Sequence, residues 1–504
     1  MCFSFFNPKS QIPNLSGLYP SQVLTLMQIK VDCPQCGGDI VFDEEIEVVR
    51  CNYCGSTNQI SGKSGNPRFM FPARWTEEKC RHRIASLLSG KVSWRLKKKG
   101  LHLVYAPYWR TIGMVFHWLL GKKEHTSPIG GRSWDDAKEL KTKLFDFSFP
   151  AYKEPDLDLI SLGVRTSAIP LQLFHHTRLS GPEIVLPVEV SLQEAMKYSS
   201  SFLTYGFSDR NFRVEFKDTQ LVGEVYSLVY FPFWVLEVIG NDRRGLLIID
   251  GVANRIRKTV WDQDVASFFQ EHKPSEPAAH FGDLRLIPFV CPVCGWDLPF
   301  SPTSKTHVCA TCTRACVENA GSYQEVEYQL IAVPEKFQHA TRYMPFWDLG
   351  MQIHTPDGVL QNRSDLRTLL PNLPAARESG DGAQSIRFLI PAFKIRNSKA
   401  LSKLATLFCV NPPSQPLRAK ENLEKEKFEG VCLGGKEAEQ LARVVLISMV
   451  PRYNRRARKV VKESKITVET SRLIYYPFYR KGHYFREASS NHPIQHGTVV
   501  LGTD

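Results

Sequence analysis

The sequence lacks the long hydrophobic runs that mark membrane-spanning helices. Its best candidate, LVYFPFWVLEVIG at 228–240, is shorter than the roughly 18 apolar residues of a membrane span and contains Pro232 and Glu237. Residues 1–30 also lack a basic stretch before an apolar core, which a secretory signal requires. We therefore expect neither a transmembrane segment nor a secretory signal.

Motifs of the common enzyme classes are missing too. There is no G-x-x-x-x-G-K-[ST] loop to hold a nucleotide phosphate, and GGKEAEQ at 434–440 has its glycines and lysine at other spacings. There is no nucleophile elbow, no H-E-x-x-H and no dinucleotide-binding fingerprint. These absences favour a non-catalytic role, and no small-molecule substrate is evident.

The chain is long enough for several domains, about two to four by length alone. It has 504 residues, of which 43% are hydrophobic and 23% charged, as in soluble globular proteins. The 64 Lys and Arg residues exceed the 51 Asp and Glu residues, which gives a formal net charge of +13. This balance permits contact with nucleic acid or another anionic surface, without requiring it.

Eight of the 13 cysteines form two clusters with the same C-x2-C-x14-C-x2-C spacing. Four thiolates at this spacing can close a tetrahedral zinc shell, and glycines after the cysteine pairs suit tight turns. The sequence therefore predicts two structural Zn²⁺ ions and a reducing compartment, the cytoplasm. The predicted ligands are Cys33, Cys36, Cys51 and Cys54 in the first cluster, and Cys291, Cys294, Cys309 and Cys312 in the second.

The second cluster is less regular than the first. Thr313 stands where the first cluster has Gly55, and His307 and Cys316 are extra candidate ligands that could substitute for a cysteine. Loss of one cysteine ligand would open a coordination position, so a metal-dependent enzyme at this cluster is a remote alternative. Rubredoxin-type iron sites have similar turns, but their usual intervening segment is longer and more aromatic, which disfavours iron.

Four segments share a Tyr-x-Pro-aromatic-aromatic pattern typical of strands. Their prolines have no backbone N–H to donate to a neighbouring strand, so they suit a strand start, an edge or a bulge. Their aromatic residues are interpreted as part of the sheet core. Helices capped by Thr76 and Ser191 are expected before two of the segments. The segments are LVYAPYW at 103–109, LVYFPFW at 228–234, RYMPFW at 342–347 and LIYYPFY at 473–479.

The order of these features predicts an α+β fold with two zinc ribbons and repeated helix and antiparallel-sheet units in a tandem duplication. Met27, just before the first ribbon, is an alternative start of the chain. The expected parts are a disordered tail (1–27), zinc ribbon 1 (28–62), a first repeat pair (63–275) with an insertion near 120–180, zinc ribbon 2 (286–320), and a second repeat pair (321–504) with a charged insertion near 410–470.

The cysteine clusters and the repeated Tyr-x-Pro-Phe-Trp segments together resemble uncharacterised bacterial zinc-ribbon proteins. The clusters by themselves are similar to zinc ribbons of transcription factors and RNA polymerase subunits. The resemblance covers most of the chain, and it implies a zinc-bearing protein with no established activity.

Two kinds of partner fit these observations. The leading interpretation is a non-catalytic interaction or scaffold protein, whose ribbons stabilise the fold and whose sheet edges dock a protein complex. The alternative is a nucleic-acid-binding protein that uses the basic segments 91–100 and 452–465, although such runs are also typical of solvated helix faces. Its candidate phosphate contacts are Lys97, Lys98, Lys99, Arg455, Arg456, Arg458 and Lys459.

Overall fold

The fold of the described chain is mixed α and β and consists mostly of strands. Below, the N-terminal half denotes residues 26–269 and the C-terminal half residues 281–500. The computed structural model describes residues 26–73, 76–88, 94–126, 131–163, 165–175, 179, 183–240, 243–253, 255–269, 281–319, 321–334, 337, 341–371, 373–374, 385–413, 416–420 and 427–500. The predicted tail therefore lies almost wholly outside the described residues.

The elements of the N-terminal half are β1 (Gln28–Asp32), β2 (Asp39–Asp43), β3 (Val48–Arg50), β4 (Thr57–Ser61), β5 (Arg68–Met70), α1 (Glu77–Leu88), β6 (Trp94–Thr126), β7 (Arg132–Pro150), α2 (Arg165–Ala168), β8 (Leu171–Leu173), β9 (Ile184–Val185), α3 (Leu192–Ser200), β10 (Phe212–Gly240), β11 (Arg243–Asp250), β12 (Ile256–Trp261) and α4 (Val265–Phe269). Thr76 and Ser191 cap α1 and α3 as predicted, and Ser191 forms a capping box with Glu194.

The elements of the C-terminal half are β13 (Arg285–Pro288), β14 (Thr306–Val308), β15 (Ala315–Asn319), β16 (Ser322–Val326), β17 (Tyr328–Ile331), β18 (Thr341–Thr355), β19 (Gly358–Leu360), α5 (Arg363–Leu369), β20 (Ile386–Pro391), α6 (Ser398–Val410), β21 (Leu417–Arg418), β22 (Lys427–Phe428), α7 (Gly435–Met449), α8 (Arg455–Glu463), β23 (Lys465–Lys481), β24 (Tyr484–Glu487) and β25 (Pro493–Gln495). None of the helices in the described ranges is both long and apolar enough to cross a membrane.

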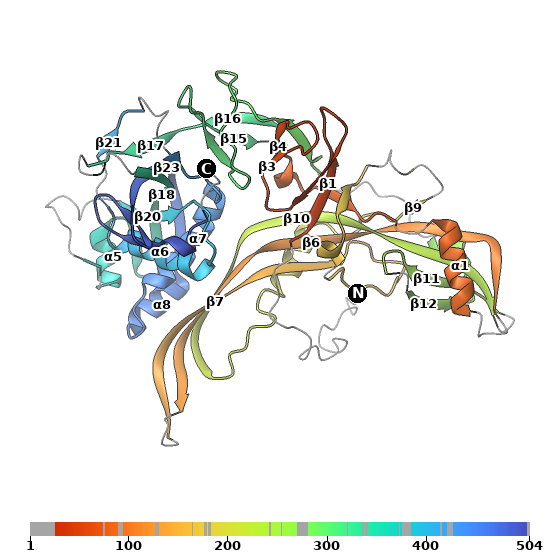
Figure 1. Ribbon diagram of the computed structural model, residues 1–504. Coiled ribbons are helices and arrows are strands. Elements are labelled where there is room, and N and C mark those ends of the chain that lie inside the picture. The colour runs from red at the N-terminus through yellow and green to blue at the C-terminus, as the bar shows by residue number, and fades with distance from the viewer. Residues whose placement is uncertain are drawn as a thin grey trace.

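Each half is built on one large sheet (Figure 1). The N-terminal sheet follows the order β12-β11-β10-β5-β8-β1-β2, with β6 along β10 and both β7 and β9 along β6. The C-terminal sheet follows β19-β18-β23-β17-β21, with β20 and β22 on β18, β24 on β23 and β25 on β24. Two small sheets, β13-β4-β3 and β14-β15-β16, belong to the ribbons that lie between these bodies.

The prolines of the four Tyr-x-Pro segments each lie where one edge of a long strand changes its partner. On β6, Pro107 lies between the short strand β9 and the end of β7. On β18, Pro345 lies between β22 and β20 in the same way. Pro232 lies between the partners β5 and β11, and Pro477 between β17 and β24. At such a position, here called a proline gap, one partner strand has ended and the next has not begun, so the missing N–H of proline is tolerated within a long paired strand.

Backbone contacts around these prolines match between the halves. The carbonyls of Pro107 and Pro345 accept hydrogen bonds from Ala151 at 2.8 Å and Ala392 at 2.9 Å. The tryptophan two residues after each of these prolines donates through Nε1 to a carbonyl just before a helix: Trp109 to Val190 before α3, and Trp347 to Leu433 before α7, both at 2.7 Å. In each half, the tryptophan two residues after the proline thus fixes the start of a helix onto the sheet.

Most aromatic side chains of the four segments lie in the cores, as predicted, and are not available to stack on a ligand, whereas Trp347 and Tyr479 are half-buried. The buried ones are Tyr105, Tyr108, Trp109, Tyr230, Phe231, Phe233, Trp234, Tyr343, Phe346, Tyr475, Tyr476 and Phe478.

Strand β7, residues 108–126 of β6 and residues 212–229 of β10 form a long antiparallel extension, here called the arm, which joins the halves (Figure 1). Its outer part packs Phe116, Trp118 and Leu120 into one core with apolar residues of α7 and α8. The Trp118 indole donates to the carbonyl of Val444 on α7 at 3.2 Å. The segment near 120–180 thus contributes to the arm, and the segment near 410–470 contributes the two helices that cover it.

Candidate metal centres and basic cavity

Each Cys-x-x-Cys pair forms the same hydrogen-bonded turn, here called a knuckle. The first cysteine accepts a hydrogen bond at its carbonyl from the fourth residue after it, and donates its N–H to the carbonyl of the fifth. In the first knuckle these bonds join Cys33 to Gly37 and Gly38, both at 2.9 Å. The pattern recurs from Cys51, Cys291 and Cys309, at 2.7–3.0 Å.

The knuckles bring the predicted cysteine ligands into two groups of four. Within each group all Sγ atoms lie within 4.8 Å of one another. Two pairs of Sγ atoms are 3.7 and 3.8 Å apart in ribbon 1, and two pairs are 3.5 and 3.6 Å apart in ribbon 2. A tetrahedral Zn–S shell with bonds of about 2.3 Å has sulfur–sulfur edges of about 3.8 Å, so the donor sets fit a thiolate-bound metal ion.

His307 and Cys316 lie beside the second group and have other partners. The His307 imidazole is buried, packs edge-to-face on Phe289 and contacts Gln59 Oε1 at 3.2 Å. Burial lowers the pKa of His307 to about 3, so the ring is neutral. The Cys316 thiol donates to the carbonyl of His307 at 3.7 Å. Among the described residues, the sets of Cys, His, Asp and Glu that could hold a metal are the two four-cysteine groups.

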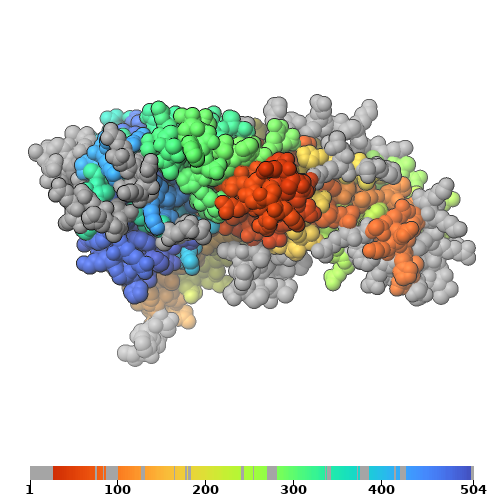
Figure 2. Space-filling view, turned by 45° about the horizontal axis from the view of Figure 1, so that its top comes forward, coloured from red at the N-terminus to blue at the C-terminus, as the bar shows by residue number. Residues whose placement is uncertain are grey.

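The two ribbons form one body. Strand β13, which leads into ribbon 2, pairs antiparallel with β4 of ribbon 1, and Pro302 of ribbon 2 accepts hydrogen bonds from Glu47 and Val48 of ribbon 1. Val48 also packs against Cys291 and Cys309 of the second metal group. Figure 2 shows the ribbons as neighbouring red and green surfaces. The metal groups are therefore placed where the halves meet.

Thr313 occupies the knuckle position that the other three knuckles give to glycine. Its φ is +59°, and the φ of its counterpart Gly55 is +75°. A β-branched residue in this left-handed region costs about 1–2 kcal/mol relative to glycine. Part of that difference is offset because glycine has more conformational freedom in the unfolded chain.

We expect Thr313→Gly to strengthen ribbon 2 by about 0.5–1 kcal/mol, because the backbone strain is relieved. The measurement is the rate at which a chelator extracts metal, which should fall in this variant. Gly55→Thr is the reciprocal change, and a Cβ there meets no atom within 4 Å, so it tests backbone strain without a clash. Faster extraction from Thr313→Gly than from the unaltered protein would contradict the expectation.

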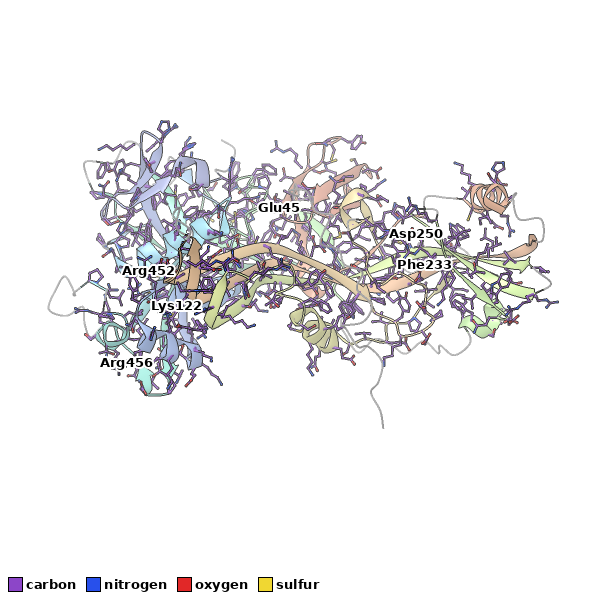
Figure 3. The ribbon with its side chains drawn as sticks, turned by 90° about the horizontal axis from the view of Figure 1, so that it is seen from below. Glu45, Lys122, Phe233, Asp250, Arg452 and Arg456 are labelled. Carbon is purple, nitrogen blue, oxygen red and sulfur yellow. The ribbon has the colours of Figure 1, made fainter. Side chains whose placement is uncertain are left out.

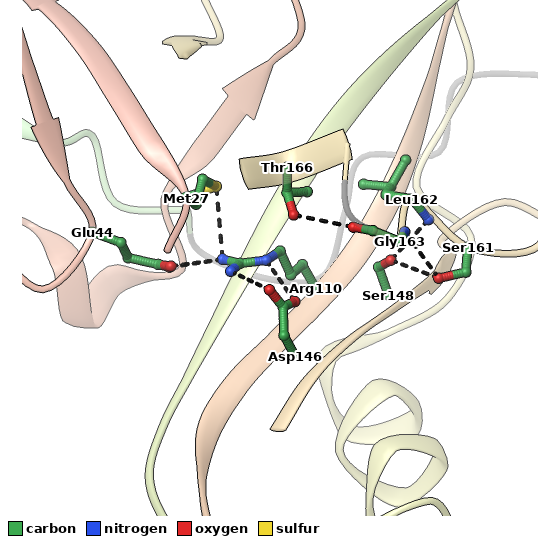
Figure 4. A network of polar contacts seen from close by, with 9 residues as sticks. All are labelled: Met27, Glu44, Arg110, Asp146, Ser148, Ser161, Leu162, Gly163 and Thr166. Carbon is green, nitrogen blue, oxygen red and sulfur yellow. Dashed lines mark hydrogen bonds and ion pairs between the residues drawn. The ribbon is translucent and has the colours of Figure 1, made fainter. Parts of the chain in front are cut away.

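A buried arginine fixes ribbon 1 to the arm (Figure 4). The Arg110 guanidinium on β6 is 0% exposed and donates to both carboxylate oxygens of Glu44 at 2.9 Å and to those of Asp146 at 2.7 and 2.8 Å. It also contacts Met27 Sδ at 3.6 Å. Burial alone would lower the pKa of Arg110, but the two carboxylates raise it above its usual value.

The predicted basic residues are separated by the structure. Arg455, Arg458 and Lys459 on α8 line a cavity of about 550 Å³ against the arm, here called the basic cavity. Arg456 is exposed on the same helix and is not part of its lining. Figure 3 shows Arg456 apart from the region where Lys122 and Arg452 lie together. The side chains of Lys97, Lys98 and Lys99, on β6, lie outside the described residues.

Sequence reasoning missed three further cations of this cavity, Lys122 and Arg213 on the arm and Lys462 on α8. Lys122 and Arg213 lie in strands of mixed charge, so no sequence pattern marks them as part of a basic site. The position of Lys462 could have been predicted from the sequence, because residues 455, 458, 459 and 462 follow the spacing of one helix face. Residue 456 does not follow this spacing.

Comparison with protein-family models, curated proteins and solved structures found no match to this chain. Functional conclusions therefore rest on the geometry of the two metal groups and on the surfaces around them.

Proposed function

We propose that this chain is a zinc-stabilised, non-catalytic interaction protein. The observation that carries the proposal is the pairing of β13 with β4, which places both four-cysteine groups in one body between the halves. Metal at these groups stabilises that body because it fixes both ends of each ribbon. Four thiolates fill a tetrahedral shell, which leaves no coordination position for a substrate.

Zinc is the metal we assign to both groups, two ions per chain. Four cysteine thiolates in a tetrahedral set are typical of structural zinc, and cysteine ligands of this kind suit a reducing, cytoplasmic setting. Iron would be distinguished by a visible thiolate-to-metal absorption band.

We also propose that the two halves are related by tandem duplication. The repeated features in support are the proline gaps, the tryptophan contacts before α3 and α7, and the cross-strand registers. Pro107 lies opposite Tyr230, as Pro345 lies opposite Tyr475. A relationship to bacterial zinc-ribbon proteins is likewise proposed from repeated sequence features.

The knuckles present apolar side chains to solvent, which supports protein docking at the ribbons. Tyr53, Val293 and Trp296 are 72%, 56% and 66% exposed, and each lies within or next to a knuckle. Because the knuckle backbone is fixed by its hydrogen bonds, these side chains are displayed on a rigid surface, as in many protein interfaces. We assign the docking surface to them.

The test is co-purification of the tagged protein from its own cells. We expect one stoichiometric protein partner to be retained by the unaltered protein and lost from Tyr53→Ser and Trp296→Ser, since both remove large contacts. Zinc content should stay at about two per chain in both variants, because neither side chain is a ligand.

The matched control is Tyr484→Ser, which removes an exposed tyrosine from β24, a strand of the C-terminal sheet and not of the ribbons. It should retain the partner. The proposal is wrong if no protein is retained, or if the retained set is the same in all four proteins.

Nucleic-acid binding is the second candidate function. The basic cavity favours it, because segment 452–465 supplies several of the lining cations.

A further inference from the structure

The basic cavity is lined by cations from two separate parts of the chain. Helix α8 forms one wall, and strands β6 and β10 of the arm form the other. Six of the eight lining residues are basic and one is acidic: Lys122, Arg213, Glu215, Phe216, Arg455, Arg458, Lys459 and Lys462. Such a concentration of one charge in a concave surface attracts anions.

Two of these cations are direct cross-strand neighbours. Lys122 on β6 lies opposite Arg213 on β10. Like charges at opposite positions of an antiparallel pair repel each other and destabilise the sheet. Asp136 on β7 lies opposite Lys122 on its other side and offsets part of that cost, and an anion bound between the two cations and α8 would offset more of it.

Arg458 is the buried member of the set. Its side chain is 4% exposed, and Nη1 donates to Glu215 Oε2 at 2.8 Å. Asp136 Oδ1, which also has no hydrogen-bond partner in the described residues, is 3.8 Å from Nη2, within ion-pair range but beyond hydrogen-bond distance. Within the described part of the chain, neither Nε nor Nη2 has a hydrogen-bond acceptor. Buried donors of a charged group are rarely left unpaired, so this guanidinium lacks an acceptor that a bound anion would supply.

A second hollow adjoins the basic cavity and shares Lys122 with it. It has a volume of about 1000 Å³, and its lining includes Trp134 on β7 and Tyr453 in the turn before α8. The Tyr453 side chain is 64% exposed. Arg213 lies over one face of Trp134 and Arg452 over one face of Tyr453, so a base would stack on the opposite face of a ring. Aromatic faces next to a cationic cavity are the arrangement by which proteins stack a base while they hold its phosphate.

We propose that the basic cavity binds the phosphate of a nucleotide and that the adjoining hollow stacks its base. The nucleotide is either free or part of a single strand, since both carry the same two groups. Arg458 and Arg455 hold the phosphate, Lys122 lies at the boundary, and Tyr453 contacts the base. This site is independent of the metal groups and of the ribbon surface.

The experiment measures anisotropy of a fluorescent single-stranded oligonucleotide of about 15 nucleotides, with adenosine monophosphate and inorganic phosphate as competitors. Zinc-loaded full-length protein is used throughout. We expect saturable binding that weakens as salt rises, with a log–log slope that falls by about 0.7 for each phosphate contact removed. Competition by the mononucleotide at concentrations like those of the oligonucleotide would identify a free nucleotide as the ligand, and much weaker competition a strand.

The exposed cations give the cleanest variants. Arg455→Gln and Lys459→Gln should each weaken binding by about fivefold or more, while Arg456→Gln, which removes the same charge from the same helix outside the cavity, should change it less than about twofold. Arg458→Lys keeps the charge opposite Glu215 but loses donors, and should also weaken binding without unfolding. Tyr453→Ala should weaken oligonucleotide binding and leave phosphate competition unchanged, with Tyr484→Ala as its control.

Three results would overturn the proposal. The first is that none of the three probes binds. The second is that Arg456→Gln weakens binding as much as Arg455→Gln, which would indicate diffuse charge and not a cavity. The third is that inorganic phosphate competes as well as the mononucleotide and that Tyr453→Ala has no effect, which would leave no role for a base.

Discussion

Replacing Cys36 with serine is expected to reduce the zinc content from about two ions per chain to about one and to unfold ribbon 1. Zinc binding at a four-ligand site contributes on the order of 10–16 kcal/mol to the folded state, and a hydroxyl does not replace a thiolate at this metal. Because β4 of ribbon 1 pairs with β13, ribbon 2 loses a supporting strand as well. Metal analysis and limited proteolysis measure the two effects.

Cys316→Ser is the matched control for the ligand assignment. This cysteine is buried beside the second metal group, but its thiol donates to a backbone carbonyl. The variant should keep about two zinc ions. Loss of zinc from Cys316→Ser, or full zinc and full protease resistance in Cys36→Ser, would show that the ligand set is different.

Arg110→Met is expected to destabilise the protein by about 3–5 kcal/mol, the usual cost of removing one partner from a buried ion pair. Methionine fills much of the same volume, but it leaves Glu44 and Asp146 without their shared cation. Their side chains are only 14% and 32% exposed, so water can solvate them only in part. The measurement is the shift of the denaturation midpoint in urea.

Two further variants separate this effect from a general loss of charge. Arg243→Met removes an exposed arginine from its pair with Asp262 and should leave the midpoint unchanged, because surface pairs contribute little. Adding Glu44→Gln and Asp146→Asn to Arg110→Met should restore part of the stability, since the unpaired charges are then gone. A midpoint for Arg110→Met equal to that of Arg243→Met would contradict the expectation.

The knuckles could be predicted from the sequence because everything that forms them is local. Two cysteines, a turn of four residues and a residue at positive φ lie within five positions of each other, and the same pattern occurs four times. Burial of the Tyr-x-Pro aromatics was predictable for a similar reason, since apolar neighbours surround each segment.

The pairing of the two ribbons was not predictable in this way. It depends on contacts such as His307 with Gln59, which are 248 positions apart, and the polarity of His307 and Gln59 gives no hint of burial. The basic cavity was predictable only in part. Helical spacing distinguishes Arg456 from Arg455 and Lys459, whereas the opposite wall comes from strands more than 200 positions away.

The arm also has a consequence for the order in which the chain folds. Trp118 contacts Val444, 326 positions later, so its side of the arm has no cover while the N-terminal half is being synthesised. At about 5–20 residues per second, the ribosome needs tens of seconds to reach α7. During this time an apolar strand surface is open to aggregation or to a chaperone. The C-terminal half, in turn, cannot complete its own core without a strand made long before it.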